Sequence, residues 1–172
     1  MATKLVVMGV AGCGKSVLAE RLTRQLGAAM LEGDDFHLPA SKEKMRAGVA
    51  LDDADREPWL ARLGALMATR GENLVLSCSA LKRKYRDQLR SFVPGLRFVY
   101  LEIDVHTAAK RVESRSGHLF PKSLVTTQFA VLESPVGEAG VFPVSALLPT
   151  EAQARAVAEW LTAGATARQK GA

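Results

Sequence analysis

The stretch Lys4-Leu-Val-Val-Met-Gly-Val-Ala-Gly-Cys-Gly-Lys-Ser16 decides the fold, because a short apolar run leads directly into a glycine-rich loop. Residues 9–16 fit the pattern G-x-x-x-x-G-K-[ST], and residues 15–26 continue with apolar side chains at helical spacing. A strand, such a loop and a helix in succession are the context that a nucleoside triphosphate site requires. A chance glycine-rich turn is the weaker interpretation, so the stretch predicts binding of a phosphate chain.

The residues of this loop have separate predicted roles. Lys15 reaches the β- and γ-phosphates, and Ser16 is a candidate ligand of Mg²⁺. The start of a helix can lower a thiol pKa, so we expect at most oxidation sensitivity at Cys13 and no catalytic role. The backbone is expected to hold the phosphates at four loop positions, Gly9, Gly12, Cys13 and Gly14.

Apolar runs alternate with helix-period stretches along the rest of the chain, which is α/β order. Runs without polar alternation suit strands covered on both faces, so we predict five parallel strands at 4–8, 28–31, 74–76, 98–101 and 141–144. The predicted helices span 15–26, 41–47, 58–69, 82–91, 105–114, 123–132 and a last stretch from Thr150 into the 160s, with a capping box between Thr150 and Gln153. The 172 residues predict one domain with a frayed tail at about 165–172.

Composition excludes some classes of protein. Hydrophobic residues make up 48% and charged residues 24%, which argues against disorder, and the net charge of +5 favours an anionic ligand. The first apolar run is too short for a signal or a membrane span, and Cys13 and Cys78 are too few for a disulfide framework. We therefore expect a cytoplasmic protein with no membrane partner. Aromatic residues are only 6%, which disfavours a nucleic-acid partner.

Acidic residues follow the second predicted strand, at the sheet edge where open α/β folds bind ligands. Asp34 is the candidate base that orients an acceptor hydroxyl and takes its proton, although a solvated turn is the alternative. Glu32 is the candidate for holding Mg²⁺ through water, because no Walker-B aspartate ends the strand at 74–76. For Asp35, a role at the site and a place in a solvated turn are weighted equally. His37 can hydrogen-bond a polar substrate, although a lone histidine is more often structural.

Two basic clusters have the spacing of one helical face. Lys82 and Arg86 are four residues apart and can clamp an anionic acceptor or the phosphoryl group, whereas Arg83, Lys84 and Arg90 are interpreted as a solvated basic face. Arg111 and Arg115 are also four apart and precede a segment with Gly117 and Pro121, so we predict a hinged lid at about 114–122. A plain surface helix is the alternative for this second cluster.

Six stretches together resemble the gluconate kinases of the small P-loop kinase group, and the resemblance runs from about Leu5 to Pro135. They are GVAGCGKS (9–16), LEGDDFH (31–37), KEKMRAGVALDDADREPWL (42–60), CSALKRKYRDQLR (78–90), RSGHLF (115–120) and QFAVLESP (128–135). The resemblance implies a three-layer P-loop fold with strand order 2-3-1-4-5 and a small helical lid. It also implies ATP with Mg²⁺, phosphorylation of D-gluconate at the 6-hydroxyl to 6-phosphogluconate, and a homodimer.

The resemblance also implies roles for individual residues. It assigns Gly12, Gly14, Lys15 and Ser16 to ATP and Mg²⁺, Asp34 to the acceptor hydroxyl, and Arg111 and Arg115 to the lid. It assigns His37, Lys82 and Arg86 to the sugar acid. Arg56 is interpreted first as a structural ion-pair residue and second as a substrate contact. The stretch 144–149 departs from the family's polar turn, so we expect backbone groups to contact the adenine.

Three alternatives stay open. A related kinase can act on another hydroxylated anion, such as shikimate or an adenylylsulfate, because the basic clusters specify charge better than shape. An NTP-gated switch or nucleic-acid binder is favoured by the pI of about 9.5 alone. A nucleotide-binding protein without catalysis is disfavoured by the presence of Lys15, Ser16 and Asp34.

Overall fold

One parallel sheet organises the molecule, which is described by a computed structural model over residues 2–114 and 123–169. The strands pair in the order β2-β3-β1-β4-β5, all in parallel. Their bounds are β1 (Lys4–Met8), β2 (Ala29–Glu32), β3 (Leu74–Ser77), β4 (Arg97–Glu102) and β5 (Val141–Ser145). The predicted five-stranded α/β fold is confirmed, as is the strand order that the resemblance implies.

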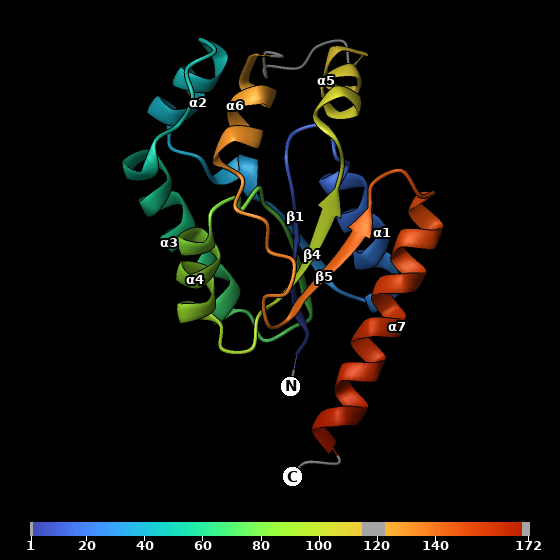
Figure 1. The fold of residues 1–172 in the computed structure, drawn as a ribbon. Coiled ribbons are helices and arrows are strands. Elements are labelled where there is room, and N and C mark those ends of the chain that lie inside the picture. The colour runs from blue at the N-terminus through green and yellow to red at the C-terminus, as the bar shows by residue number, and fades with distance from the viewer. Residues whose placement is uncertain (1, 115–122, 170–172) are drawn as a thin grey trace.

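Helices cover both faces of the sheet and the carboxyl ends of its strands (Figure 1). They are α1 (Lys15–Leu26), α2 (Pro39–Arg46), α3 (Asp53–Thr69), α4 (Arg83–Phe92), α5 (Val105–Ser114), α6 (Ser123–Val131) and α7 (Thr150–Gln169), with a short 3-10 helix, η1 (Gly33–Phe36). The pair α3 and α4 covers one face of the sheet, and α1 and α7 cover the other. Helices α2, α5 and α6 lie beyond the carboxyl ends of the strands, where ligands of such sheets bind.

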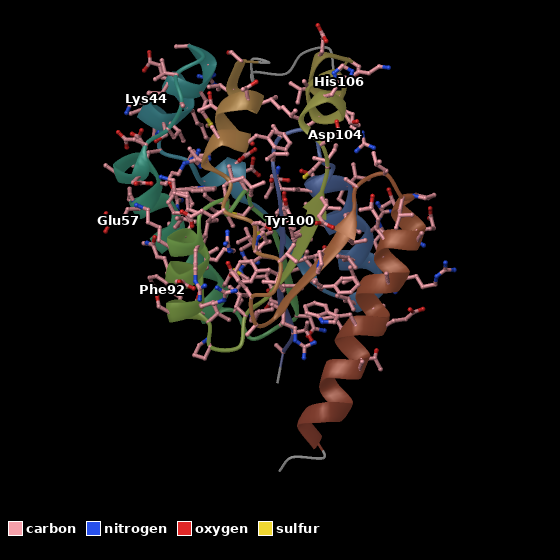
Figure 2. All side chains as sticks on the ribbon, viewed as in Figure 1. Lys44, Glu57, Phe92, Tyr100, Asp104 and His106 are labelled. Atoms are coloured by element: carbon pink, nitrogen blue, oxygen red, sulfur yellow. The ribbon has the colours of Figure 1, made fainter. Side chains whose placement is uncertain are left out.

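The central strand β1 contributes to both cores, because successive strand side chains point to opposite faces. Leu5 and Val7 pack with α1 and α7, whereas Val6 and Met8 pack with α3 and α4. All four side chains are fully buried, which explains the uninterrupted apolar run. In Figure 2 Tyr100 of β4 likewise lies inside the molecule, with Phe92 of α4 on its outer layer.

Helix α3 begins five residues before the predicted start at residue 58. Asp52 Oδ1 accepts a hydrogen bond from the Asp55 N–H at 2.8 Å, and Asp55 Oδ2 accepts one from the Asp52 N–H at 3.1 Å. This reciprocal capping box fixes the helix start, so Pro58 lies inside the helix. Lys44 of α2 adds an ion pair to Asp55 at 2.7 Å.

The last helix begins at Thr150 as predicted, but its start is capped differently and its backbone is helical further than expected. Thr150 is already helical, and the Gln153 amide donates to the carbonyls of Ser145 and Leu148, so the expected capping box does not form. The backbone stays helical to Gln169, where the sequence predicts fraying from 165. The predicted lid, except for Ser114, and its Arg115 lie outside the described residues. Within the described part of the chain, no helix combines the length and apolar character of a membrane span.

Candidate active site

The glycine-rich loop lies between β1 and α1, as predicted, and its backbone geometry depends on glycine. Gly12 and Gly14 have positive φ values of 82° and 95°. A Cβ on Gly12 would lie 2.6 Å from the Ala108 carbonyl oxygen, so α5 packs directly on the loop. Around Gly14, which immediately precedes α1, a Cβ would meet nothing within 4 Å. The loop is therefore tight against the protein on one side and open at the helix start.

The ends of β2 and β3 bring oxygen atoms next to α1. Glu32 and Ser77 are register partners, and Ser16 donates a 2.6 Å hydrogen bond to Glu32 Oε2. The Ser16 and Ser77 hydroxyl oxygens are 3.5 Å apart. Oxygen atoms are the ligands that Mg²⁺ prefers, so this group suits the cation that the sequence predicts here. The described residues contain no cluster of three or more His, Cys, Asp or Glu able to hold a metal alone.

A cavity of about 460 Å³ opens above the loop and contains most of the predicted site. From the loop it is lined by Lys15, whose Nζ donates to the Val10 carbonyl at 3.0 Å, and by Ser16. Other predicted residues on its walls are Glu32, Asp34, His37 and Lys82. Helix α6 and the start of α3 with its N-cap supply further lining residues that were not predicted from the sequence, including Asp52, Asp53, Thr127 and Gln128.

The acceptor side is built around Trp59 of α3. Its indole N–H donates to the Gly33 carbonyl at 2.8 Å, and its ring stacks on His37 with centroids 4.1 Å apart. His37 is 5% exposed, its Nε2 lies 3.6 Å from Asp34 Oδ1, and its Nδ1 has no hydrogen-bond partner among the described residues. The Trp59 contact therefore fixes the imidazole beside the predicted base.

The Asp34 carboxylate is exposed to the cavity and surrounded by cationic groups. The adjacent His37 imidazole is the main cause that holds the pKa of Asp34 below its ordinary value, and Lys15 and Arg56 add to it. Asp34 is consequently ionised at neutral pH. Arg56 also lines the cavity, where its Nε bonds to the Leu51 carbonyl and its guanidinium lies over the Tyr85 ring at 5.7 Å. An ion pair of Arg56, the first interpretation from sequence, is not seen within the described residues.

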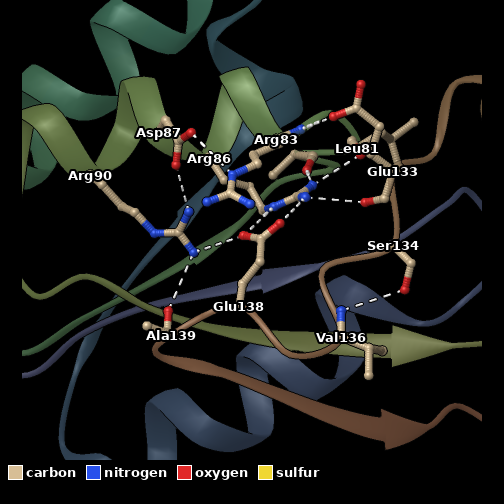
Figure 3. Close-up of polar contacts among 11 residues, drawn as sticks. Leu81, Arg83, Arg86, Asp87, Arg90, Glu133, Ser134, Val136, Glu138 and Ala139 are labelled. Carbon is tan, nitrogen blue, oxygen red and sulfur yellow. Dashed lines mark hydrogen bonds and ion pairs between the residues drawn. The ribbon is translucent and has the colours of Figure 1, made fainter.

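Arg86 does not face the cavity, so its predicted substrate role is wrong in this structure. The side chain is fully buried, and all five of its N–H groups are used (Figure 3). Three donate to the carbonyls of Ala80, Leu81 and Glu133, and two donate to the Glu138 carboxylate. Lys82 and Arg86 are four residues apart, but their side chains do not lie on one helical face. Helix α4 begins only at Arg83, and Lys82 still has an extended backbone.

The neighbouring basic residues also have partners. Arg90, expected on a solvated face, is largely buried and contacts Glu138 at 3.0 Å as well as Asp87 at 2.8 Å (Figure 3). Glu138 comes from the loop before β5, 52 residues after Arg86 in the sequence. Burial alone would raise the pKa of Glu138, but the hydrogen bonds from Arg86 and Arg90 outweigh it and lower that pKa.

The expectation of a lowered thiol pKa at Cys13 is wrong. Its side chain is 1% exposed and packs in the core beneath the loop, and this burial raises the pKa. Only its backbone remains available to a phosphate. Arg111 lies at a second cavity of about 280 Å³ on the α5 and α7 side of the loop, where its Nη2 donates to the Ala146 carbonyl at 3.0 Å.

A phosphate-binding loop, a group of side-chain oxygen atoms beside it and an ionised carboxylate in one cavity define the protein as a P-loop phosphotransferase. A family model described as an AAA domain matches residues 5–135. The chain is 44% identical to the gluconokinase of Gluconobacter oxydans, covering 82% of this chain and 81% of that one. It is 43% identical to the thermoresistant gluconokinase of Escherichia coli, covering 76% of each. The chain belongs to the gluconokinase family.

Solved structures agree with this assignment. A gluconokinase from Sinorhizobium meliloti superposes with a TM-score of 0.82 at 42% identity, covering 93% of this chain and 95% of that one. A sugar kinase from Janibacter gives a TM-score of 0.90 at 34% identity, covering 94% and 95%. An adenylylsulfate kinase from Mycobacterium tuberculosis is 20% identical with a TM-score of 0.68, which shows a shared fold.

Proposed function

We propose that this protein transfers the γ-phosphoryl group of ATP to the 6-hydroxyl of D-gluconate, giving 6-phosphogluconate and ADP. The observation that carries the proposal is that Lys15, Asp34 and Lys82 line one cavity, with the phosphate-binding loop at one side of it. Membership of the gluconokinase family supplies the acceptor. The alternative, a kinase for another hydroxylated anion, uses the same cavity chemistry.

Asp34 acts on the acceptor in this reaction. Its ionised carboxylate accepts a hydrogen bond from the attacking hydroxyl and takes the proton as the new P–O bond forms and the bond to ADP breaks. His37 is fixed by Trp59 and holds Asp34 in the cavity. Lys82 and Arg56 supply positive charge for the acceptor carboxylate.

The loop acts on the nucleotide. Lys15 exchanges the Val10 carbonyl for phosphate oxygens, and the backbone N–H groups at the start of α1 hold the phosphates. Ser16 is the proposed direct Mg²⁺ ligand, and Glu32, bonded to it, is the proposed ligand through water. A cation held by these residues would neutralise negative charge on the nucleotide phosphates. The second cavity, beside Gly12 and Gly14, is the proposed nucleobase site, with Arg111 and Leu148 on its walls.

A coupled ADP-release assay tests the proposal. The purified protein is given ATP and Mg²⁺ with D-gluconate, other sugar acids, shikimate, adenylylsulfate or nucleoside monophosphates, and Lys15→Ala serves as the inactive control. Turnover confined to D-gluconate is the expected result. Turnover with another acceptor alone would keep the phosphoryl-transfer mechanism and contradict D-gluconate as the acceptor. No ADP release with any acceptor would contradict the kinase assignment.

Two further expectations belong to the proposal. One is a homodimer, which the resemblance implies, and the other is a cytoplasmic location, which the short first apolar run and the two cysteines favour. Light scattering after gel filtration tests the first, and fractionation of cells expressing the chain tests the second. A single-chain mass in the first measurement, or recovery with membranes in the second, would contradict them. Arg115 and the lid keep their proposed role in neutralising the transferring group.

A further inference from the structure

Helix α6 contacts the phosphate-binding loop through one side chain. Gln128 Oε1 accepts a 2.7 Å hydrogen bond from the backbone N–H of Ala11, across 117 residues of sequence. Gln128 is half-buried and lines the main cavity, which Lys15 and Asp34 also line. The motif pattern leaves residue 11 free, so sequence spacing contains no signal for this contact.

The orientation of the carboxamide follows from the chemistry of its partner. A backbone N–H can only donate, so the oxygen of Gln128 must face Ala11 and the NH₂ group must face away from it. No hydrogen bond joins this NH₂ group to any other residue in the described part of the chain. Among the described residues, the two N–H donors of Gln128 are therefore without a partner, on a side chain that lines the cavity.

Helix α6 ends at Val131 and is anchored two residues later through Glu133, so Gln128 is not on a loose element. The Glu133 N–H donates to the Leu81 carbonyl at 3.0 Å, and Glu133 Oε2 accepts from the Arg83 N–H at 2.6 Å (Figure 3). Arg86 adds a hydrogen bond to the Glu133 carbonyl. These contacts join the end of α6 to the start of α4, next to Lys82 on the acceptor side.

We infer that Gln128 is a further catalytic residue, whose carboxamide NH₂ donates to an oxygen of the γ-phosphoryl group while its oxygen stays on Ala11. The inference rests on the proposed function. A neutral donor suits this position, because Lys15 already supplies positive charge to the phosphates. The carboxamide adds a hydrogen bond of fixed direction that orients the γ-phosphoryl group. A contact to the γ-phosphoryl group would distinguish ATP from ADP, which lacks that group.

Two substitutions separate this role from a structural one. Gln128→Glu keeps an oxygen for the Ala11 N–H but replaces the NH₂ donors with an acceptor, whereas Gln128→Met removes both interactions. Thr126→Ala is the matched control, since Thr126 is exposed on the same helix and does not line the cavity. Calorimetry measures the affinity of each variant for ADP and for a non-hydrolysable ATP analogue, each with Mg²⁺, and thermal denaturation checks folding.

Both Gln128 variants should bind the ATP analogue about tenfold more weakly, with ADP affinity within about twofold of the parent. Their kcat with D-gluconate should fall by at least the same factor, and Thr126→Ala should change neither quantity. Parent-like behaviour of Gln128→Glu would overturn the inference, as would equal losses for ADP and the analogue. If Gln128→Met does not fold, Gln128→Glu alone decides. The binding measurements involve no acceptor, so they remain decisive if D-gluconate is not the substrate.

Discussion

The Lys82 ammonium lies 2.9 Å from Asp53 Oδ1, and the same carboxylate also contacts Lys84 and accepts a hydrogen bond from the Tyr85 hydroxyl. These interactions hold the pKa of Asp53 well below its ordinary value, with Lys84 as the largest cause. One aspartate at the start of α3 thus holds the segment at the start of α4. Of the two lysines, only Lys82 lines the cavity.

This asymmetry gives a matched pair of substitutions. Lys82→Ala should raise the KM for D-gluconate about 10- to 100-fold, because a hydrogen bond to a charged group contributes about 1.5–3 kcal/mol. The KM for ATP should stay within about twofold. Lys84→Ala removes a lysine from the same aspartate outside the cavity and should leave both constants unchanged. Steady-state kinetics check this, and equal effects of the two substitutions would contradict a substrate role for Lys82.

Asp34→Asn should lower kcat by about 10²–10⁴, the usual contribution of a general base, and should leave binding of a non-hydrolysable ATP analogue nearly unchanged. Asp35→Asn is the control, since Asp35 is exposed and does not line the cavity. Single-turnover kinetics and calorimetry measure the two quantities. Near-normal turnover of Asp34→Asn would show that another group takes the proton.

The pH dependence of kcat/KM should reflect the lowered pKa of Asp34. The ionised carboxylate is the active form, so its contribution is complete above the ordinary value of 3.8 and is lost only as the pH falls through the lowered pKa. No acid limb due to Asp34 should therefore be seen between about pH 5 and 8. A limb in that range that disappears in Asp34→Asn would contradict the pKa direction.

Arg86→Met should lower the free energy of unfolding by about 3–5 kcal/mol, because it leaves the Glu138 carboxylate, which is 9% exposed, without its main partner. Arg83→Met, at an exposed position of the same helix, should change it by less than about 0.5 kcal/mol. Urea denaturation measures both. A parent-like stability combined with a raised acceptor KM would restore the substrate role of Arg86.

Glu138 adds a pH test of the same network. Its pKa is lowered in the folded protein, so its stabilising contribution is present above the ordinary value of 4.5 and is lost as the pH falls through the lowered pKa. The stability advantage of the parent over Glu138→Gln should therefore shrink below about pH 4.5. Urea midpoints measured at several pH values check this, and an advantage that persists at acidic pH would contradict it.

Both thiols should be inert in the folded protein. Burial raises the pKa of Cys13 and raises that of Cys78 to about 12, so the thiolate is scarce at pH 8. Ellman's reagent should label neither cysteine over minutes and both after unfolding in urea. Rapid labelling of Cys13 in the folded protein would instead support the redox sensitivity that the sequence predicts.

The sequence by itself determined the strands, the phosphate-binding loop and the acidic turn, because each is local. Uninterrupted apolar runs are readable wherever a strand is buried on both faces, and the loop motif fixes its own backbone. Glu32 and Asp34 could be predicted from their position at the carboxyl end of β2, where Glu32 is the last residue of the strand and Asp34 lies two residues further on. The start of α3 was missed although its signal is local, since Asp52 and Asp55 have the spacing of a capping box.

Only the tertiary structure decided which charged side chains reach the cavity. Arg86 and Lys82 are both cationic and lie four residues apart, yet Arg86 is closed off by Glu138 from a loop 52 residues away, whereas Lys82 lines the cavity. The hydrogen bond from the Ala11 N–H to Gln128 likewise depends on tertiary packing, because α6 packs over the loop. Burial and long-range pairing determine the role of a charged or polar group, and neither is encoded in the spacing of neighbouring residues.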